Sequence, residues 1–383
     1  MIKEYFNSTY PSVEHLREQA RKRLPKFAFE YLDSGCYSEI NLFKNTSDIR
    51  NIELQPYYLQ GFKGANIKTR VFGEEYAAPF GMAPVGLQGL MWPQACEILA
   101  KATVEHNLPF VLSTVSTASI EKIAKITDGR FWFQLYHPVE EEVKKNLLDR
   151  AWNAGARTLV ILADVPTFAY RPKEIKNGLS IPPRLTLDNI WQIFTHPTWS
   201  LSQLMNGIPK FQTVDKYIPK GLDIKHLGMF MDKMFNGRLT NEKVSLIRDY
   251  WKGNLVIKGT VTSKDIESSI KLGLDGVIIS NHGGRQLDNG PSTIASLREI
   301  KSYKDKIKLM IDSGIRSGPD VANMLASGAD FTFLGRAPMY AVSALGKNGG
   351  NHIFTMFKRQ FTQVMEQLAC ERIEDLPNFI VKK

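Results

Sequence analysis

A histidine and an arginine follow the same short apolar run, three positions apart, within residues 280–288. The run at residues 276–279 is β-branched and uninterrupted, which is typical of a strand buried on both faces. The two glycines between His282 and Arg285 let the backbone turn sharply and let a ligand approach closely. One side chain can act as a base, and the other can hold a carboxylate by two hydrogen bonds. A glycine-rich connector with a surface arginine is the alternative interpretation.

Eight short apolar runs, each followed by a helical stretch, predict the elements that position these side chains. The runs are residues 80–83, 110–112, 131–135, 158–162, 255–257, 277–279, 308–311 and 331–334. The helical stretches are residues 94–106, 119–126, 140–154, 242–251, 263–272, 294–302, 318–326, 338–345 and 352–368. Such connections indicate parallel pairing, and eight units that close on themselves form a (β/α)8 TIM barrel, an α/β fold. An open doubly wound sheet competes, but no G-x-G-x-x-G follows the first run.

In such a barrel the active site lies at the C-terminal ends of the strands. The predicted ends supply a lysine, a histidine, two carboxylates and three arginines. Gly314 with Arg316 and Gly335 with Arg336 follow the last two strands, where barrels commonly bind a phosphate. Helix-capping glycines beside surface arginines would explain each pair separately. Two pairs on adjacent strands favour a phosphorylated ligand.

Three further segments flank or interrupt the barrel in what we expect to be one domain. The predicted parts of the domain at 1–383 are an N-terminal extension at 1–78, a barrel at 79–346, an insertion at 172–241 and a C-terminal helix and tail at 347–383. In the extension, Ser12 can cap a first helix and Pro25 can open a second. The insertion follows the fourth strand and is far longer than one crossover needs.

The insertion mixes large apolar residues such as Trp191 and Trp199 with several lysines. This composition favours a segment that lies in a membrane interface, with a partner-binding segment or a covering loop as the alternatives. Residues 189–209 carry no formal charge and are long enough to cross a bilayer. Their many polar groups and Pro197 argue against a transmembrane helix.

Composition restricts the class of protein further. The 383 residues are 43% hydrophobic and 23% charged, as in ordinary globular proteins, with a formal net charge of +10. The positive charges are scattered and no zinc-finger or RNA-binding motif is present, so they fit an anionic ligand or membrane surface better than a nucleic acid.

Cys36, Cys96 and Cys370 are far apart, which argues against a disulfide framework or a metal site and fits a reducing compartment. The N-terminus lacks the apolar core of a signal peptide.

Five stretches of the chain resemble the FMN-dependent 2-hydroxy acid oxidases and dehydrogenases. They are SNHGGRQLD at 280–288, FQLY at 133–136, VIKG at 256–259, DSGIR at 312–316 and LGRA at 334–337. SNHGGRQLD together with DSGIR is highly specific, and the resemblance extends from about Leu24 to Cys370. The family fold is a barrel that holds FMN at its mouth. The resemblance therefore implies FMN as the cofactor, in agreement with the expected barrel and phosphate site.

The resemblance also implies roles for the matching residues. The implied catalytic residues are the base His282, its partner Asp164, and Tyr136, which would hydrogen-bond the substrate oxygen. The implied ligands of the substrate are Tyr31, Arg171 and Arg285, together with Tyr136. The residues implied to bind FMN are Pro84, Val85, Gly86, Ser113, Gln134, Lys258, Ser280, Asp312, Gly314, Arg316, Gly335 and Arg336. Among these, Lys258 would stabilise the reduced flavin near N1 and O2.

Three positions depart from the pattern of the family. Leu162 stands where a threonine usually bonds the flavin, and Val115 stands where glycolate oxidase has a tryptophan. Gly86 replaces an alanine found in many members. The changes at Val115 and Gly86 predict a roomier substrate pocket and resemble the lactate and mandelate dehydrogenases.

These resemblances predict a flavin-dependent (S)-2-hydroxy acid dehydrogenase with L-lactate as the expected substrate, oxidised to pyruvate. Electrons would pass to quinone in the respiratory chain, from a peripheral enzyme on the cytoplasmic side of the inner membrane. The alternatives are a dehydrogenase for (S)-mandelate or another bulky acid, an oxidase that reduces oxygen, and a non-catalytic phosphate-binding barrel. The resemblance also suggests a homotetramer.

Overall fold

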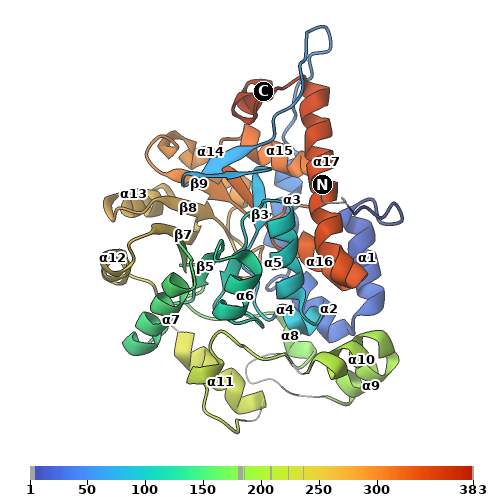
Figure 1. The fold of residues 1–383 in the computed structure, drawn as a ribbon, viewed down its shortest axis with the longest axis vertical. Helices are drawn as coiled ribbons and strands as arrows, with labels where there is room; N and C mark the ends of the chain where they lie inside the picture. Colours follow the sequence, from blue (N-terminus) through green and yellow to red (C-terminus); the bar gives the residue numbers. More distant parts are fainter. Residues whose placement is uncertain are drawn as a thin grey trace.

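Eight parallel strands form a barrel at the centre of the computed structural model (Figure 1). The model describes residues 5–179, 184, 186–207, 209–222, 224–235 and 237–381. The strands are β3 (Phe80–Met82), β4 (Val111–Ser113), β5 (Trp132–Leu135), β6 (Thr158–Leu162), β7 (Asn254–Thr260), β8 (Gly276–Ile279), β9 (Lys308–Ile311) and β10 (Phe331–Leu334). They pair in the order β3-β10-β9-β8-β7-β6-β5-β4, and a parallel bridge between Met82 and Phe110 joins the two ends. This confirms the predicted TIM barrel.

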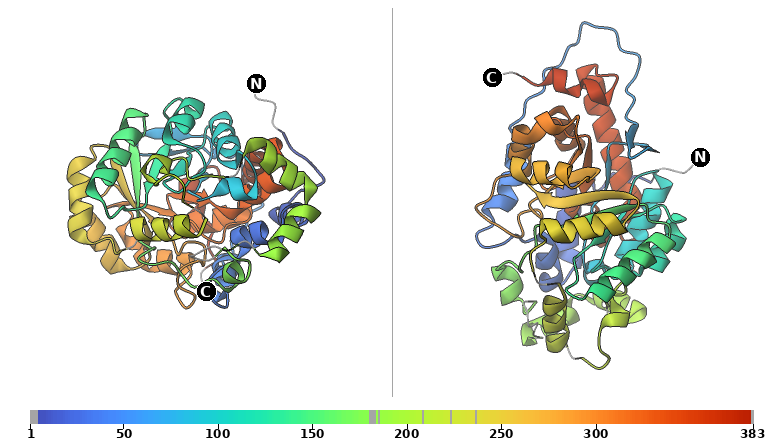
Figure 2. Two further views of the ribbon diagram at one scale, coloured as in Figure 1. Left: turned by 90° about the horizontal axis from the view of Figure 1, so that it is seen from below. Right: turned by 90° about the vertical axis from the view of Figure 1, so that its left-hand side faces the viewer.

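Helices surround the barrel, each in its expected place after a strand (Figure 2). They are α5 (Ala95–Glu105), α6 (Ile120–Thr127), α7 (Glu141–Asn153), α12 (Asn241–Tyr250), α13 (Ser263–Lys271), α14 (Thr293–Ile300), α15 (Gly318–Ala326), α16 (Arg336–Leu345) and α17 (Gly349–Leu368). Side chains of Ser119, Thr262, Ser292 and Ser317 cap four of them, which fixes where each helix begins. The strand ends are thereby held at one edge of the barrel.

The inside of the barrel is packed with side chains from alternating strand positions. Val160, Val256, Ile278 and Met310 form one buried cluster with the large rings of β5 and β10. A hairpin of β1 (Thr69–Val71) and β2 (Glu74–Tyr76), which the sequence did not predict, packs Phe72 and Tyr76 against this cluster. Because this interior is filled, a ligand can enter only at the opposite end, where the strands terminate.

The N-terminal extension packs beside the last helices of the barrel (Figure 1). As predicted, Ser12 caps α1 (Val13–Arg23), and α2 (Lys26–Asp33) follows Pro25. A third helix, α3 (Ile40–Arg50), was not predicted, because its apolar pattern is weak and its N-cap Glu39 lies in the left-handed region. α1 packs on α16, so the chain around α2 is held at the mouth of the barrel.

The insertion lies beyond the strand ends, at the bottom of Figure 1. It contains α8 (Pro172–Lys176), α9 (Leu187–Thr195), α10 (Pro197–Asn206) and α11 (Ile224–Phe235). The short α4 (Gln88–Met91) follows β3, and both α4 and α8 contact α2. Pro197 opens α10 and separates it from α9, as the sequence indicated. Among the helices of the described ranges, none is long and apolar enough to cross a membrane.

Candidate active site

The C-terminal ends of the strands surround a cavity of about 1490 Å³. Most of the predicted site residues line it: Tyr31, Pro84, Val85, Gly86, Ser113, Gln134, Tyr136, Arg171, Lys258, His282, Arg285, Asp312, Gly314, Arg316, Gly335 and Arg336. Asp164 and Ser280 do not line the cavity. They lie behind it, where each contacts a side chain that does.

His282 and Asp164 form a hydrogen-bonded pair at the end of β8. The His282 Nδ1 atom lies 3.0 Å from Asp164 Oδ1, so Nδ1 carries the donated proton and Nε2 remains to accept another. His282 has φ of 57°, a left-handed conformation that turns its ring towards Asp164. Burial lowers the pKa of His282, although the Asp164 carboxylate acts in the opposite direction. The imidazole is therefore neutral near pH 7, as a general base requires.

The pKa of Asp164 responds to the same surroundings. Burial alone would raise it, but the electrostatic interaction with His282, the hydrogen bond from His282 and the charge of Lys258 outweigh burial and hold the pKa below its ordinary value. The Oδ2 atom of Asp164 is buried without a hydrogen-bond partner among the described residues. An ionised carboxylate at this place can stabilise a positive imidazolium.

Lys258 is a buried ammonium group at the end of β7. Its Nζ donates to Ser280 Oγ at 2.8 Å and lies 3.1 Å from Asp312 Oδ2. Burial would lower the pKa of Lys258, but Asp312 and Asp164 raise it, so the lysine remains charged. The Ser280 hydroxyl also accepts from the backbone N–H of His282 at 3.1 Å. Ser280 therefore positions the lysine and the histidine together from behind the cavity wall, and its predicted contact with the flavin stays a prediction.

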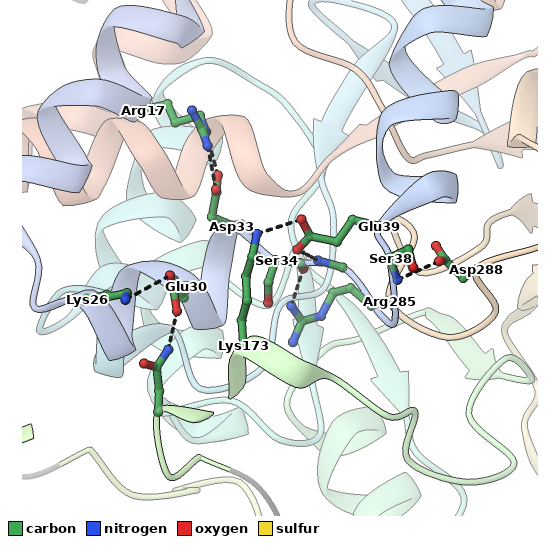
Figure 3. Close-up of polar contacts among 12 residues, drawn as sticks. Arg17, Lys26, Glu30, Asp33, Ser34, Ser38, Glu39, Lys173, Arg285 and Asp288 are labelled. Atoms are coloured by element: carbon green, nitrogen blue, oxygen red, sulfur yellow. Dashed lines mark hydrogen bonds and ion pairs between the residues drawn. The ribbon is translucent and has the colours of Figure 1, made fainter. Parts of the chain in front are cut away.

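Arg285 is fixed by the N-terminal extension and by a carboxylate. Its Nη1 donates to the carbonyls of Tyr31 at 2.8 Å and Ser34 at 2.9 Å, and its Nη2 donates to Glu174 at 2.6 Å (the Ser34 contact is drawn in Figure 3). Within the described part of the chain these contacts use three of five N–H groups. The Nε–H and one Nη2–H remain as donors for a carboxylate.

Arg171 lies beside Arg285 and shares its acidic partner. Arg171 donates from Nε to the carbonyl of Arg285 at 3.2 Å, from Nη1 to Glu174 at 3.3 Å and from Nη2 to Gln286 at 3.0 Å. One proton on Nη1 and one on Nη2 remain after these contacts. Two preorganised guanidinium groups thus face the cavity beside Tyr31, as predicted for recognition of a carboxylate.

Tyr136 brings a phenol to the same cavity. Its backbone N–H donates to Thr114 Oγ1 at 3.1 Å, which fixes the end of β5. Burial raises the pKa of Tyr136, and the charge of Asp164 acts in the same direction, so the hydroxyl stays protonated and can donate a hydrogen bond. The ring of Phe235, from α11 of the insertion, meets Tyr136 edge-on at 5.8 Å between centroids.

A phosphate was expected to bind at the ends of β9 and β10, where Arg316 and Arg336 lie in different surroundings. Arg316 and Arg336 both line the cavity, and the Arg336 guanidinium also donates to the carbonyls of Leu32, Gly283 and Ser34, each at 2.9 Å. Burial lowers the pKa of Arg336 to about 10. One N–H on Nη1 and one on Nη2 of Arg336 remain after these contacts, and the first backbone N–H groups of α16 are further donors to a phosphate there, so the predicted role of Arg336 stays a prediction.

Comparison with known proteins identifies the family. A family model described as FMN-dependent dehydrogenase matches residues 20–383. This chain belongs to the FMN-dependent dehydrogenases. An L-lactate dehydrogenase of Pseudomonas entomophila (strain L48) is 36% identical to this FMN-dependent dehydrogenase over 364 residues, which cover 94% of this chain and 95% of that protein. The protein is thus an oxidoreductase that uses FMN to oxidise a 2-hydroxy acid.

Solved structures of related proteins resemble this FMN-dependent dehydrogenase closely. The crystal structure of the monotopic membrane protein (S)-mandelate dehydrogenase matches with a TM-score of 0.92 at 31% identity, over 98% of this chain and 100% of that chain. A mandelate oxidase matches with a TM-score of 0.83 at 27% identity, over 98% and 99% of the two chains.

The cavity of this FMN-dependent dehydrogenase fits FMN. Its volume of about 1490 Å³ exceeds the roughly 300–1,000 Å³ of a common ligand pocket, which leaves space for a cofactor and a substrate together. Ser113 and Gln134 supply hydrogen-bonding groups for a flavin ring, and Lys258 supplies the buried cation. Arg316 and the first N–H groups of α16 would hold the phosphate.

Two of the three departures have a structural explanation. A Cβ atom on Gly86 would lie 2.8 Å from Val115 Cγ2, so Val115 occupies the space that an alanine would need. Gly86 and Val115 therefore fit each other sterically, and the roomier substrate pocket stays a prediction. Leu162 is buried in β6 and does not line the cavity.

The sequence prediction missed two parts of the site. Glu174 is buried and lines the cavity between the two arginines. Its spacing of three from Arg171, on a helix opened by Pro172, was a signal for this contact. Phe235 and Met231 of α11 also line the cavity, but nothing local in the sequence links them to β5.

Proposed function

We propose that this enzyme oxidises L-lactate to pyruvate and passes the electrons to a membrane quinone. The observation that carries the proposal is the convergence of the His282–Asp164 pair with two arginines at one cavity. The identity of 36% to L-lactate dehydrogenases over nearly the whole chain supports lactate as the substrate.

Each side chain of the site has a separate role in the oxidation. Arg285 and Arg171 bind the substrate carboxylate, and Tyr136 donates a hydrogen bond to the oxygen at C2. His282 Nε2 accepts one proton as the C2 centre loses two electrons and becomes a carbonyl, and Asp164 stabilises the resulting imidazolium. FMN, when bound, takes up the two electrons together with the second proton. Lys258 supplies positive charge where the reduced cofactor would be anionic.

A second candidate substrate is (S)-mandelate or another 2-hydroxy acid with a bulky side chain. The presence of Val115 rather than an aromatic residue in the cavity wall favours it, as does the fold match to (S)-mandelate dehydrogenase. Anaerobic reduction of the bound flavin by L-lactate and (S)-mandelate, compared at equal concentration, separates the two. We expect the higher kcat/KM with L-lactate, and a higher value with (S)-mandelate would reverse the assignment.

The acceptor requires a separate test, because a mandelate oxidase shares the fold. We expect rapid turnover with a soluble quinone analogue and slow consumption of oxygen. Peroxide formed in equal amount with keto acid, in air and without an added acceptor, would identify an oxidase instead.

A membrane surface is the proposed location, because α9 and α10 bury polar side chains against the protein and expose large apolar side chains on the outer face. Their polar side chains Gln192 and Gln203 are buried, where Gln192 Oε1 accepts from Phe27 N and Gln203 Nε2 donates to Gly89 O. Phe194, Leu204 and Met205 are instead 76%, 81% and 78% exposed. Apolar groups arranged in this way favour insertion into the headgroup region of a bilayer. We place the enzyme peripherally on the cytoplasmic side of the inner membrane, as a homotetramer.

A further inference from the structure

A second groove, of about 490 Å³, lies outside the active site, between α10 and the C-terminal end of α1 (Figure 1, lower right). Its first wall is one face of α10, with side chains at positions 198, 201, 202, 205 and 206, which are spaced as neighbours on a helix surface. Its other wall is formed by Arg23, the last residue of α1, and by Trp92, which follows α4. The groove therefore lies where the insertion meets the N-terminal extension.

Arg23 brings an unpaired positive charge to this groove. The two basic residues before it both pair with Glu18, but within the described part of the chain Arg23 forms no ion pair. Its guanidinium lies over the ring of Trp92, 4.2 Å from the centroid, and its Nη1 donates to the carbonyl of Ala344. Burial lowers the pKa of Arg23. A partly buried cation without a counter-ion is unfavourable, so an anionic ligand would be stabilised here.

The wall on α10 adds apolar and hydroxyl groups to this charge. Leu201 and Met205 line the groove, and both are exposed. They continue the exposed apolar face of α10 that is proposed to enter the bilayer. The hydroxyl groups of Thr198 and Ser202 line the groove between the apolar side chains and the protein. A cation, hydroxyl groups and an apolar edge together match a phosphodiester that carries acyl chains.

We propose that this groove binds the headgroup of one anionic phospholipid. Arg23 donates two hydrogen bonds to the phosphate, and Trp92 holds the guanidinium in the orientation that this requires. Leu201 and Met205 contact the first part of the acyl chains. The inference rests on the proposed membrane location and adds the lipid that the enzyme recognises there. The site also gives the N-terminal extension a part in membrane binding, which the composition of the insertion alone does not indicate.

The test measures the binding of a soluble lipid to the FMN-loaded enzyme, so that the surface potential of a bilayer does not contribute. The probe is dihexanoyl phosphatidylglycerol, kept below its micelle concentration and titrated in a calorimeter. We expect one saturable site per chain. Dihexanoyl phosphatidylcholine should bind about fivefold more weakly, because its choline brings a second positive charge to the groove. Glycerol 3-phosphate, which lacks acyl chains, should bind at least about tenfold more weakly.

Three variants locate the lipid on the protein. Arg23→Gln should weaken the binding of phosphatidylglycerol by about tenfold or more, because the charge-assisted hydrogen bonds are lost. Ser202→Glu should weaken it to a similar extent, because a carboxylate in the groove repels the phosphate. Arg21→Gln is the matched control, since it removes the same charge from the same helix but at an exposed site paired with Glu18. It should change the dissociation constant by less than about twofold. Unchanged flavin absorbance shows that each variant is folded, and if Arg23→Gln fails to fold, Ser202→Glu decides.

The other outcomes overturn the proposal. An equal loss of affinity in Arg21→Gln and Arg23→Gln would show general attraction to positive charge rather than a site. Equal affinity for phosphatidylcholine or for glycerol 3-phosphate would exclude an anionic lipid as the specific ligand, and so would the absence of saturable binding. Sedimentation with vesicles tests the membrane location separately. An enzyme that stays in solution with vesicles, yet binds the soluble lipid through Arg23, would refute the location and retain the lipid site.

Discussion

At the scale of single residues, the account depends on a neutral His282 that is ready to accept a proton. Its pKa lies below the ordinary value of about 6.5 because burial outweighs the charge of Asp164. The base is active when deprotonated, so activity is present above this pKa and is lost as the pH falls through it. We expect kcat/KM to stay level from pH 8 to about 6.5 and to decline only at lower pH. A profile of flavin reduction against pH checks this, and a decline that begins above pH 7 would contradict it.

Replacing His282 by glutamine removes the base but retains a polar group of similar length. We expect the variant to bind FMN and to lose about 10²–10⁴-fold in the rate of flavin reduction. Stopped-flow absorbance under anaerobic conditions measures that rate. Rapid bleaching of the variant by a hydroxy acid would show that another group takes the proton.

Asp164→Asn tests the partner of the histidine separately. The carboxylate raises the pKa of His282, so its removal should move the acid limb of the pH profile to lower pH. The rate should fall at every pH, because the imidazolium loses its stabilising charge. An unshifted acid limb would mean that the limb reports a group other than His282.

At the scale of elements, the insertion forms part of the substrate cavity as well as an outer surface. The backbone N–H of Val139 donates to the carbonyl of Met234 at 2.9 Å, and Phe235 packs on Tyr136. We expect Phe235→Ala to enlarge the cavity and to raise the (S)-mandelate-to-L-lactate ratio of kcat/KM by about tenfold. Phe194→Ala, on the exposed face of the same insertion, is the matched control. If the (S)-mandelate-to-L-lactate ratio is the same in Phe235→Ala and Phe194→Ala, α11 does not contribute to substrate selection.

The sequence predicted elements well wherever the signal was local. The strand at 158–162 and the helix at 318–326 have the predicted bounds, because an apolar run and a capped pattern mark each of them. α3, the β1–β2 hairpin and the role of Glu174 depend on packing between distant segments, which periodicity does not encode. The contacts of Arg336 could not be predicted from the sequence either, because its three carbonyl partners come from α2, the following turn and the loop after β8.

At the scale of the whole molecule, the buried glutamines and exposed apolar groups of α9 and α10 predict binding to a bilayer. We expect the enzyme to sediment with vesicles that contain anionic phospholipid. The double variant Leu204→Glu, Met205→Glu should stay in solution and keep its flavin, because both side chains lie on the exposed face. Glutamate at Leu59, an exposed residue outside the insertion, provides the control. If the natural enzyme remains in solution in the presence of vesicles, the membrane proposal is wrong.

Anaerobic mixing of the purified, FMN-loaded enzyme with L-lactate tests the central claim most directly. The account predicts that the flavin absorbance bleaches fully, that one pyruvate forms for each flavin, and that His282→Gln slows both changes by about 10²–10⁴-fold. A natural enzyme whose flavin stays oxidised with L-lactate and with every other 2-hydroxy acid tried would contradict it.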